Sequence, residues 1–88
     1  MHFTNARNEK VTLVPGCMIC RDDVTGTVLF FLENGMRVEF HKDRNSDPML
    51  AGHVDDLAVF RNRALIAARL FGLNIEPFST GEKAFKFV

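Results

Sequence analysis

The chain has 88 residues, of which 47% are apolar and 25% are charged, so it is long enough for one small globular domain, 1–88, and no more. Eleven Lys and Arg residues balance eleven Asp and Glu residues. This formal charge of zero argues against a general nucleic-acid coat and against a polybasic membrane binder, which both need an excess of cations.

The first half of the chain is dominated by strand signals. Residues 10–14 form a short β segment that Pro15–Gly16 ends, because proline cannot donate to a ladder and glycine accepts turn geometries. Residues 24–33 are rich in β-branched and aromatic side chains, and residues 36–42 alternate between apolar and polar side chains. Between them, Asn34–Gly35 supplies the two positive-φ residues of a type I′ turn. We therefore expect a central hairpin, 24–33/36–42.

The second half of the chain is dominated by one helix. The periodicity predicts a helix over about 53–71, with Asp55 and Asp56 near its positive end. Gly72 follows as a natural C-terminal cap, and residues 84–88 alternate enough to form a short closing strand. Together these elements predict an α+β fold, with a small antiparallel sheet of three to five strands and one long helix packed across it.

The helix carries two apolar faces. At about 100° per residue, a broad first face comprises Leu57, Phe60, Ala64, Ala67, Ala68 and Phe71. The second face comprises Val59, Ile66 and Leu70, with Arg63 beside it. A helix that lies on one sheet needs only one apolar stripe, so the second face is covered either by Phe85 and Phe87 or by another subunit. We expect a homodimer whose interface contains Val59, Arg63, Ile66 and Leu70, with the alanines allowing two helices to approach closely.

The composition adds expectations about the core and the compartment. Nine Phe residues without any Trp or Tyr supply apolar surface with no polar group attached. Because they are spread along the chain, we expect core and subunit contacts rather than a platform for stacked bases. No apolar run reaches the roughly 18 residues of a membrane span, and no signal segment is apparent, so we expect no membrane partner. Two cysteines in such a chain favour the reducing cytoplasm.

Cys17 and Cys20 form the most conspicuous local pattern. A redox Cys-x-x-Cys pair works when a helix N-terminus follows it, whereas residues 21–26 indicate a turn into a strand. A zinc site would need two more ligands, and the downstream candidates, His41 and His53, have spacings that match no zinc finger. We therefore expect two small buried thiols, with no metal site and no cofactor.

No motif predicts catalysis. Residues 79–85, STGEKAF, resemble the linker between tandem zinc fingers, but no finger flanks them. Gly81 also lacks the neighbouring residues that a phosphate-binding loop requires. His41 is expected on the wet face of a strand, where a histidine is usually only solvated. We therefore assign no catalytic residue and expect no enzymatic activity.

The order of three strands and a long helix resembles DNA-binding domains of the plant AP2 type and the arm-binding domains of integrases. Residues 64–72, ALIAARLFG, are similar to the end of the AP2 helix. The resemblance implies a nucleic-acid-binding module in which arginines on the exposed sheet face contact phosphates and guanine edges. The corresponding face here offers Arg37, Glu39 and His41. Nucleic-acid binding is therefore the alternative interpretation.

Contact with another protein is the function that we expect. Small neutral intracellular proteins without catalytic motifs include many regulators and inhibitors, among them proteins encoded by phages and mobile elements. The polar surface of the hairpin and the loop after it is the expected partner-binding surface, and it comprises Arg37, Glu39, Lys42, Asp43 and Arg44. The expected protein is thus a small cytoplasmic regulator or inhibitor that binds a protein target.

Overall fold

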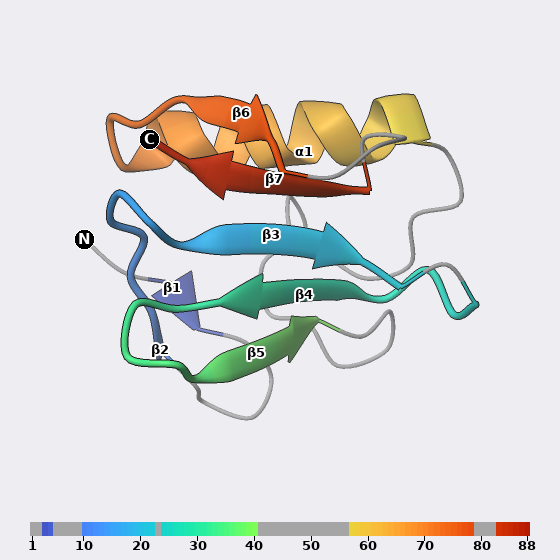
Figure 1. Cartoon of the computed structure of the whole chain (residues 1–88), viewed down its shortest axis with the longest axis horizontal. Helices are drawn as coiled ribbons and strands as arrows, with labels where there is room; N and C mark the ends of the chain where they lie inside the picture. The colour runs from blue at the N-terminus through green and yellow to red at the C-terminus, as the bar shows by residue number, and fades with distance from the viewer. Residues whose placement is uncertain (1–2, 5–9, 23, 41–56, 79–82) are drawn as a thin grey trace.

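The computed structural model of the chain describes residues 3–4, 10–22, 24–40, 57–78 and 83–88. Its elements are β1 (Phe3–Thr4), β2 (Lys10–Val11), β3 (Met18–Arg21), β4 (Val28–Phe31), β5 (Arg37–Phe40), α1 (Leu57–Leu70), β6 (Ile75–Pro77) and β7 (Ala84–Phe87). Five strands form one antiparallel sheet in the order β5-β4-β3-β7-β6, and β1 and β2 pair as a separate ribbon (Figure 1). The helix packs against this sheet, which confirms the predicted α+β fold.

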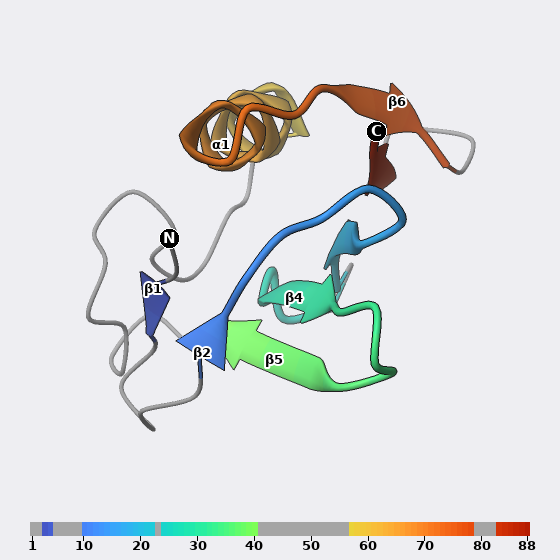
Figure 2. The ribbon, with the colours of Figure 1, turned by 90° about the vertical axis from the view of Figure 1, so that its left-hand side faces the viewer.

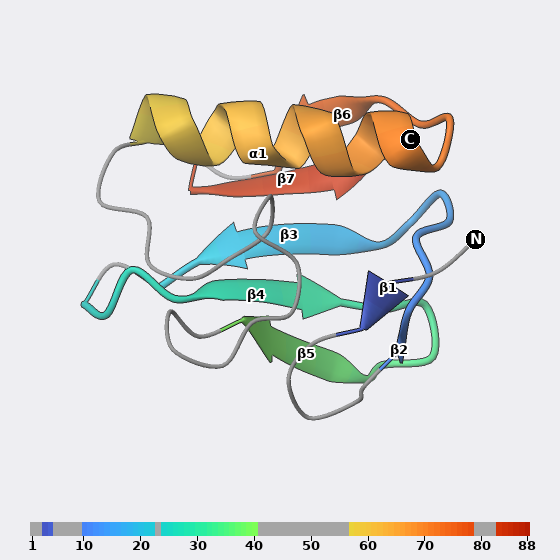
Figure 3. The same ribbon diagram turned by 180° about the vertical axis from the view of Figure 1, so that it is seen from behind.

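The helix and the β1–β2 ribbon lie on the same face of the five-stranded sheet. Figure 3 shows α1 in front of β7 near one edge, and the ribbon in front of β4 and β5 near the other edge. In the side view of Figure 2, the chain runs from β2 up to the start of β3 along this covered side. We call the covered side the inner sheet face and the opposite side the outer sheet face.

The inner sheet face carries an aromatic core. The rings of Phe30 and Phe87 stack with centroids 6.2 Å apart, and Phe60 of α1 contacts Phe85 of β7 with centroids 5.7 Å apart. The other core residues are smaller and comprise Val11, Leu13, Cys17, Ile19, Val28, Val38, Ala64, Ala67 and Ala68. The prediction that phenylalanines build the core is confirmed for these four rings, whereas Phe78 is 59% exposed.

The predicted central hairpin 24–33/36–42 is present; β4 is shorter than predicted and β5 begins at Arg37, while residues 41–42 lie outside the described residues. Strand β4 pairs antiparallel with β5, and Phe30 lies opposite Val38. Both of these side chains are buried, whereas Arg37 is exposed and Glu39 is half-buried. The alternation therefore gives β5 one buried and one wet face, as its sequence predicts.

The turn of this hairpin differs from the predicted type I′ turn. The N–H of Gly35 donates to the C=O of Leu32 at 2.9 Å, so Glu33 and Asn34 are the central turn residues. Gly35 follows with φ 84°, a left-handed conformation that glycine adopts without strain. Asn34 Oδ1 accepts the N–H of Met36 at 2.9 Å, a donor that a type I′ turn would direct to the carbonyl of Glu33. The asparagine side chain thus favours a three-residue loop, which leaves Met36 exposed.

The strand that the sequence predicts from residue 24 begins only at Val28, because Asp22 organises a loop before it. Asp22 Oδ1 accepts the N–H groups of Val24 at 2.8 Å and of Thr25 at 3.0 Å. These bonds commit two amides to an Asx turn instead of a strand ladder. The side chain of Val24 is consequently 92% exposed, although its residue type favours a strand.

Strand β3 was not predicted, because Pro15–Gly16 suggests the end of a strand. The N–H of Cys17 donates to the C=O of Val14 at 3.1 Å, and Gly16 has φ 104°. Proline followed by a positive-φ glycine is the signature of a type II turn. This turn redirects the chain into β3, which then pairs with β4 on one side and β7 on the other.

Helix α1 lies within the predicted range of about 53–71, whose first four residues are outside the described residues. The predicted cap at Gly72 is confirmed. Gly72 has φ 69°, and the N–H of Leu73 donates to the C=O of Ala68 at 2.9 Å. This hydrogen bond, from one residue to the carbonyl five residues before it, is the 6→1 bond of a Schellman motif, in which glycine ends the helix at low conformational cost.

The C-terminal strands form one side of the sheet. Strand β7 confirms the predicted closing strand, whereas its neighbour β6 was not predicted because it contains Pro77. Asn74 and Val88 form a hydrogen-bonded pair, because each donates its backbone N–H to the other's C=O at 2.9 Å. Hydrogen-bonded and non-hydrogen-bonded pairs alternate along an antiparallel ladder, so Pro77, three residues later, directs its nitrogen away from β7. Because β6 is an edge strand, the proline costs no hydrogen bond within the sheet.

The Asx turn predicts a pH-dependent contribution of Asp22 to stability. The backbone N–H groups of Thr25 and Val24 lower the pKa of Asp22 below its usual value of roughly 3.9. A lowered folded-state pKa stabilises the fold above the unfolded-state value and loses that contribution as the pH falls through the folded-state value. Asp22→Ala should lower the melting temperature at neutral pH, because it removes the acceptor.

Asp22→Asn is the matched variant, since its side-chain oxygen still accepts both N–H groups but does not ionise. Thermal unfolding at neutral pH and at about pH 3 should show the wild-type advantage over Asp22→Asn shrinking at the acidic end. An advantage that stays constant between the two pH values would contradict the role of the ionised carboxylate.

Candidate functional site

Cys17 and Cys20 lie on opposite faces of the sheet. Cys17 is buried with Ile19 on the inner sheet face, whereas Cys20 is half-buried on the outer sheet face. Two thiols that point to opposite faces of one strand cannot bind the same metal ion or form a disulfide while the strand persists. Burial raises the pKa of the Cys20 thiol, which keeps it protonated at neutral pH and makes it a poor nucleophile. The Cys-x-x-Cys pair is therefore not a joint reactive site.

The described residues contain neither a metal-binding cluster nor a helix that could cross a membrane. Among them, no three His, Cys, Asp or Glu side chains lie close enough together to hold a metal ion. His41 and His53, which the sequence suggested as ligand candidates, lie outside these residues. The described helix is too short to cross a membrane.

The second apolar face of α1 is exposed. Val59 is 43% exposed and Ile66 is 38% exposed, while Leu70 and Arg63 are half-buried. We call these four residues the outer helix arc. The buried part of the helix comprises Phe60, Ala64, Ala67 and Ala68. The first predicted face thus packs on the sheet except for Leu57, which is 37% exposed, whereas the second does not contribute to the core.

Neither the alanines nor the C-terminal phenylalanines take the roles predicted for them at the outer helix arc. Ala64, Ala67 and Ala68 are buried in the core, so they allow α1 to approach the sheet rather than a second helix. Phe85 and Phe87 are buried on the inner sheet face, where their rings contact those of Phe60 and Phe30. The alternative that these phenylalanines cover the second face of the helix is therefore wrong.

Two of the five predicted partner-binding residues lie together on the outer sheet face. Arg37 and Glu39 are alternate residues of β5, and Arg37 Nη2 lies 2.8 Å from Glu39 Oε1. Lys42, Asp43 and Arg44 lie outside the described residues. The ion pair neutralises this edge of the sheet, so the guanidinium of Arg37 does not present an isolated positive charge.

The centre of the outer sheet face is apolar, a feature that the sequence did not indicate. The strand register aligns one row of side chains from Arg37 through Phe31, Met18 and Lys86 to Glu76. A second row runs from Glu39 through Leu29 and Cys20 to Ala84. The first row has charge at both ends and the second only at Glu39, and both rows are apolar at the centre. Sequence reasoning missed this surface because it missed β3, the strand that joins the two halves of each row.

A shallow pocket of about 210 Å³ opens beside the Arg37–Glu39 ion pair. Its polar groups are already bonded to one another or to the backbone. The Asp22 carboxylate accepts two backbone N–H groups, and Thr25 Oγ1 donates to Thr27 Oγ1 at 2.8 Å. A small polar ligand would have to compete with these bonds, so the pocket is a poor candidate for a substrate site.

No family model matches this sequence, and neither a curated protein nor a solved structure matches it significantly. The function must therefore be argued from the surfaces of the chain itself. The described part of the chain presents three such surfaces: the outer helix arc, the outer sheet face, and a groove between the segment after β2 and the β4–β5 loop.

The two cysteines should respond differently to substitution by serine. Cys17→Ser places a hydroxyl in the apolar core and should lower the free energy of unfolding by about 1–3 kcal/mol. Cys20→Ser should cost less, because its side chain is only half-buried on the outer sheet face. Urea unfolding measures both values, and thiol labelling of the folded protein should modify Cys20 before Cys17. Equal costs with equal labelling rates would contradict the placement of the two thiols.

Proposed function

We propose that the protein is a non-enzymatic regulator or inhibitor that acts by contact with other protein chains. The observation that carries this proposal is the exposure of Val59 and Ile66 on a helix that already buries Phe60 and three alanines of its other apolar face. A cluster of exposed apolar side chains on a small protein usually marks a contact surface. The two free thiols support a reducing, cytoplasmic location, and the small size fits regulators of the kind that phages and mobile elements encode.

A second copy of the chain is the occupant that we propose for the outer helix arc. A two-fold axis beside α1 would bring Val59, Ile66 and Leu70 of one copy against the same residues of its partner. Each side chain is already partly covered, so it contributes less than the roughly 1.5–3 kcal/mol of complete burial. In a two-fold dimer the same side chains of both copies become buried, so each contributes its free energy of burial twice. This gain favours a homodimer over a helix surface that stays in water.

The outer sheet face is the surface that we propose for the protein target. It has an apolar centre and a charged rim, which is the usual arrangement of a protein–protein interface. Its cations are accompanied by carboxylates, since Arg37 lies beside Glu39 and Lys86 pairs in register with Glu76. A surface that reads DNA needs cations that are available to phosphates. The charge balance therefore supports a protein target over the alternative of nucleic acid.

Ile66→Glu tests the homodimer. The substitution places a charge in the proposed interface at a position that is exposed in the single chain, so it should give a folded monomer. Sedimentation at tens of micromolar should show the wild type at twice the chain mass of 10.0 kDa and the variant at that mass. Circular dichroism of the variant should retain the wild-type spectrum.

Ala58→Glu is the matched control, because it introduces the same side chain at another exposed position of α1, about 100° around the helix from Val59. It should sediment with the wild type. A monomeric wild type at this concentration, or an Ile66→Glu variant that still sediments as a dimer, would overturn the homodimer.

Binding to a random DNA duplex separates the proposed function from the alternative. At physiological salt we expect a dissociation constant no tighter than about 10⁻⁴ M, the weak end of non-specific binding. Fluorescence anisotropy of a labelled duplex measures this value at two salt concentrations. A micromolar interaction that weakens steeply with salt would favour the nucleic-acid-binding module, and Arg37 and Arg61 would be the first residues to replace.

A further inference from the structure

The charges of the chain balance overall, but those of helix α1 do not. Residues 57–70 contain no Asp or Glu, and their charged residues are Arg61, Arg63 and Arg69. In the five-stranded sheet, by contrast, opposite charges lie side by side, as in the ion pair of β5 and in the registered pair of Lys86 and Glu76. The surface of α1 is therefore locally basic on a chain whose formal charge is zero.

Two of these arginines share a side of α1 that neither the core nor the outer helix arc uses. Arg61 and Arg69 are exposed, and Leu65, midway between them, is half-buried. At about 100° per residue, this side is centred roughly 120° from the buried residues and roughly 120° from the outer helix arc. We call Arg61, Leu65 and Arg69 the basic helix ridge. A second copy seated on the outer helix arc therefore leaves the ridge accessible.

The stability of the helix accounts for only one of the two charges. A cation near the C-terminal end of a helix interacts favourably with the helix dipole, and Arg69 lies in the last turn. Arg61 lies two turns earlier, where the dipole gives a cation no such advantage. With Leu65 between them, the ridge has an apolar centre and a cation on either side, which is the arrangement of a contact surface.

The guanidinium groups of the ridge select an anionic partner. Arginine binds carboxylates and phosphates through two parallel hydrogen bonds. The phosphate backbone of nucleic acid would satisfy the two arginines but would offer no apolar group to Leu65. A protein segment can satisfy all three side chains. Charge complementarity together with the apolar centre therefore points to a segment in which carboxylates flank an apolar side chain.

The spacing of the ridge indicates the form of that segment. Arg61 and Arg69 are eight residues apart, so about 12 Å separates them along the helix axis. Residues at intervals of four form the ridges that interdigitate in the commonest class of helix pairs. A second helix with acidic residues eight positions apart and an apolar residue midway repeats the spacing of the basic helix ridge. The ridge thus fits an acidic helix.

We propose that the basic helix ridge binds an acidic helical segment of the protein target. Carboxylates of the segment pair with Arg61 and Arg69, and the apolar side chain between them packs on Leu65. The inference rests on the proposed function, protein–protein contact, and names the chemistry by which a partner is recognised. Strand β6, whose Glu76 ends a row of the outer sheet face, lies beside α1 (Figure 2), so one target can reach both surfaces around this edge.

A random library of peptides about four helical turns long, displayed on phage, tests this proposal. The library is first depleted on the double variant Arg61→Gln, Arg69→Gln and then selected on the wild type. The enriched peptides should carry two acidic residues about eight positions apart with an apolar residue between them. A synthetic copy of an enriched peptide should bind Arg61→Glu at least about tenfold more weakly than the wild type, because repulsion replaces attraction.

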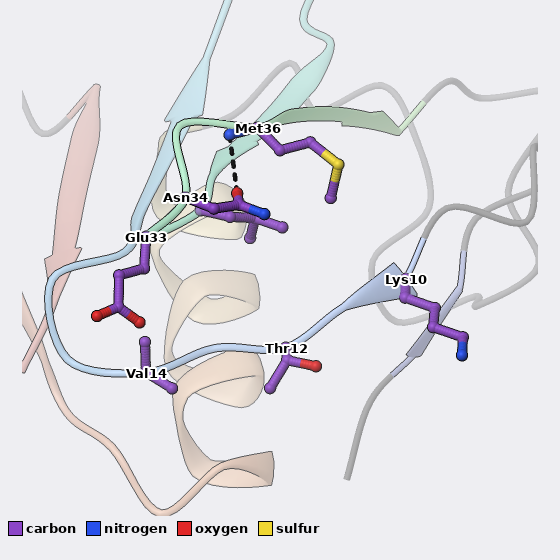
Figure 4. A pocket seen from close by; sticks show the side chains of 7 residues that line it. Lys10, Thr12, Val14, Glu33, Asn34 and Met36 are labelled. Atoms are coloured by element: carbon purple, nitrogen blue, oxygen red, sulfur yellow. Dashed lines mark hydrogen bonds between the residues drawn. The ribbon is translucent and has the colours of Figure 1, made fainter.

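Lys10→Glu is the matched control. It makes the same change in net charge at an exposed cation of β2, which lines the groove beside the β4–β5 loop (Figure 4). It should bind the peptide within about twofold of the wild type. Circular dichroism of the free arginine variants should retain the wild-type spectrum, since both arginines are exposed.

An exchange of charges gives a readout that only a direct ion pair would produce. Replacing one of the two acidic residues of the peptide by lysine should weaken binding to the wild type and restore binding to Arg61→Glu. Circular dichroism of the peptide should show helix gained on binding, and a proline at its centre should abolish binding.

Peptides that bind Arg61→Glu as well as the wild type, that give no restoration on charge exchange, or that tolerate the central proline would overturn the acidic helix but leave protein contact as the function. A random DNA duplex that displaces the peptide at micromolar concentration would assign the ridge to nucleic acid and overturn the proposal as well. A selection that enriches no peptide would have the same consequence, and the sedimentation of Ile66→Glu then judges the proposed function separately.

Discussion

The position of the C-terminal strand β7 between β3 and β6 is the constraint on which the rest of the structure depends. Phe87 of this strand stacks on Phe30 of β4, and Phe85 contacts Phe60 of α1. One strand thus connects the hairpins of the sheet, the helix and the edge strand β6. Because the other core residues are mostly small or aliphatic, these four rings supply a large part of the apolar area that holds the helix on the sheet.

The way in which the core closes determines which surfaces remain for function. Buried alanines bring the helix backbone close to the sheet, and the next residues around the helix, Val59 and Ile66, are left exposed. The helix and the β1–β2 ribbon cover only the inner sheet face (Figure 3), so the outer sheet face keeps an apolar centre. A groove of about 350 Å³ remains between the segment after β2 and the β4–β5 loop. All three surfaces are suited to contact with polypeptide chains.

The sequence predicts those parts of this fold that depend on local signals. The alternation in β5, the long helix and the glycine cap at Gly72 are recognisable because neighbouring residues determine them. Strand β6 is not recognisable, since it is a strand only through pairing with β7, and β3 is hidden by the turn signal of Pro15–Gly16 before it, although it pairs with β4 as well as with the distant β7. Side-chain hydrogen bonds explain the remaining errors, because Asp22 shortens β4 and Asn34 changes the turn. For the same reason, Val59 and Ile66 could be predicted as a surface, whereas the groove depends on two segments that only the tertiary structure brings together.

The helix and the outer sheet face lie on opposite sides of the sheet, and this arrangement bears on the proposed mode of action. Helix α1 covers the inner sheet face, so the row of side chains from Arg37 to Glu76 lies on the side away from it (Figure 3). A homodimer formed through the outer helix arc, as we propose, would therefore leave the outer sheet face of each copy uncovered. A target with two suitable sites would bind its second site intramolecularly, and such linkage raises apparent affinity by roughly 10²–10⁴ when the linker spans the two sites. Self-association would then strengthen an interaction whose affinity one small surface limits.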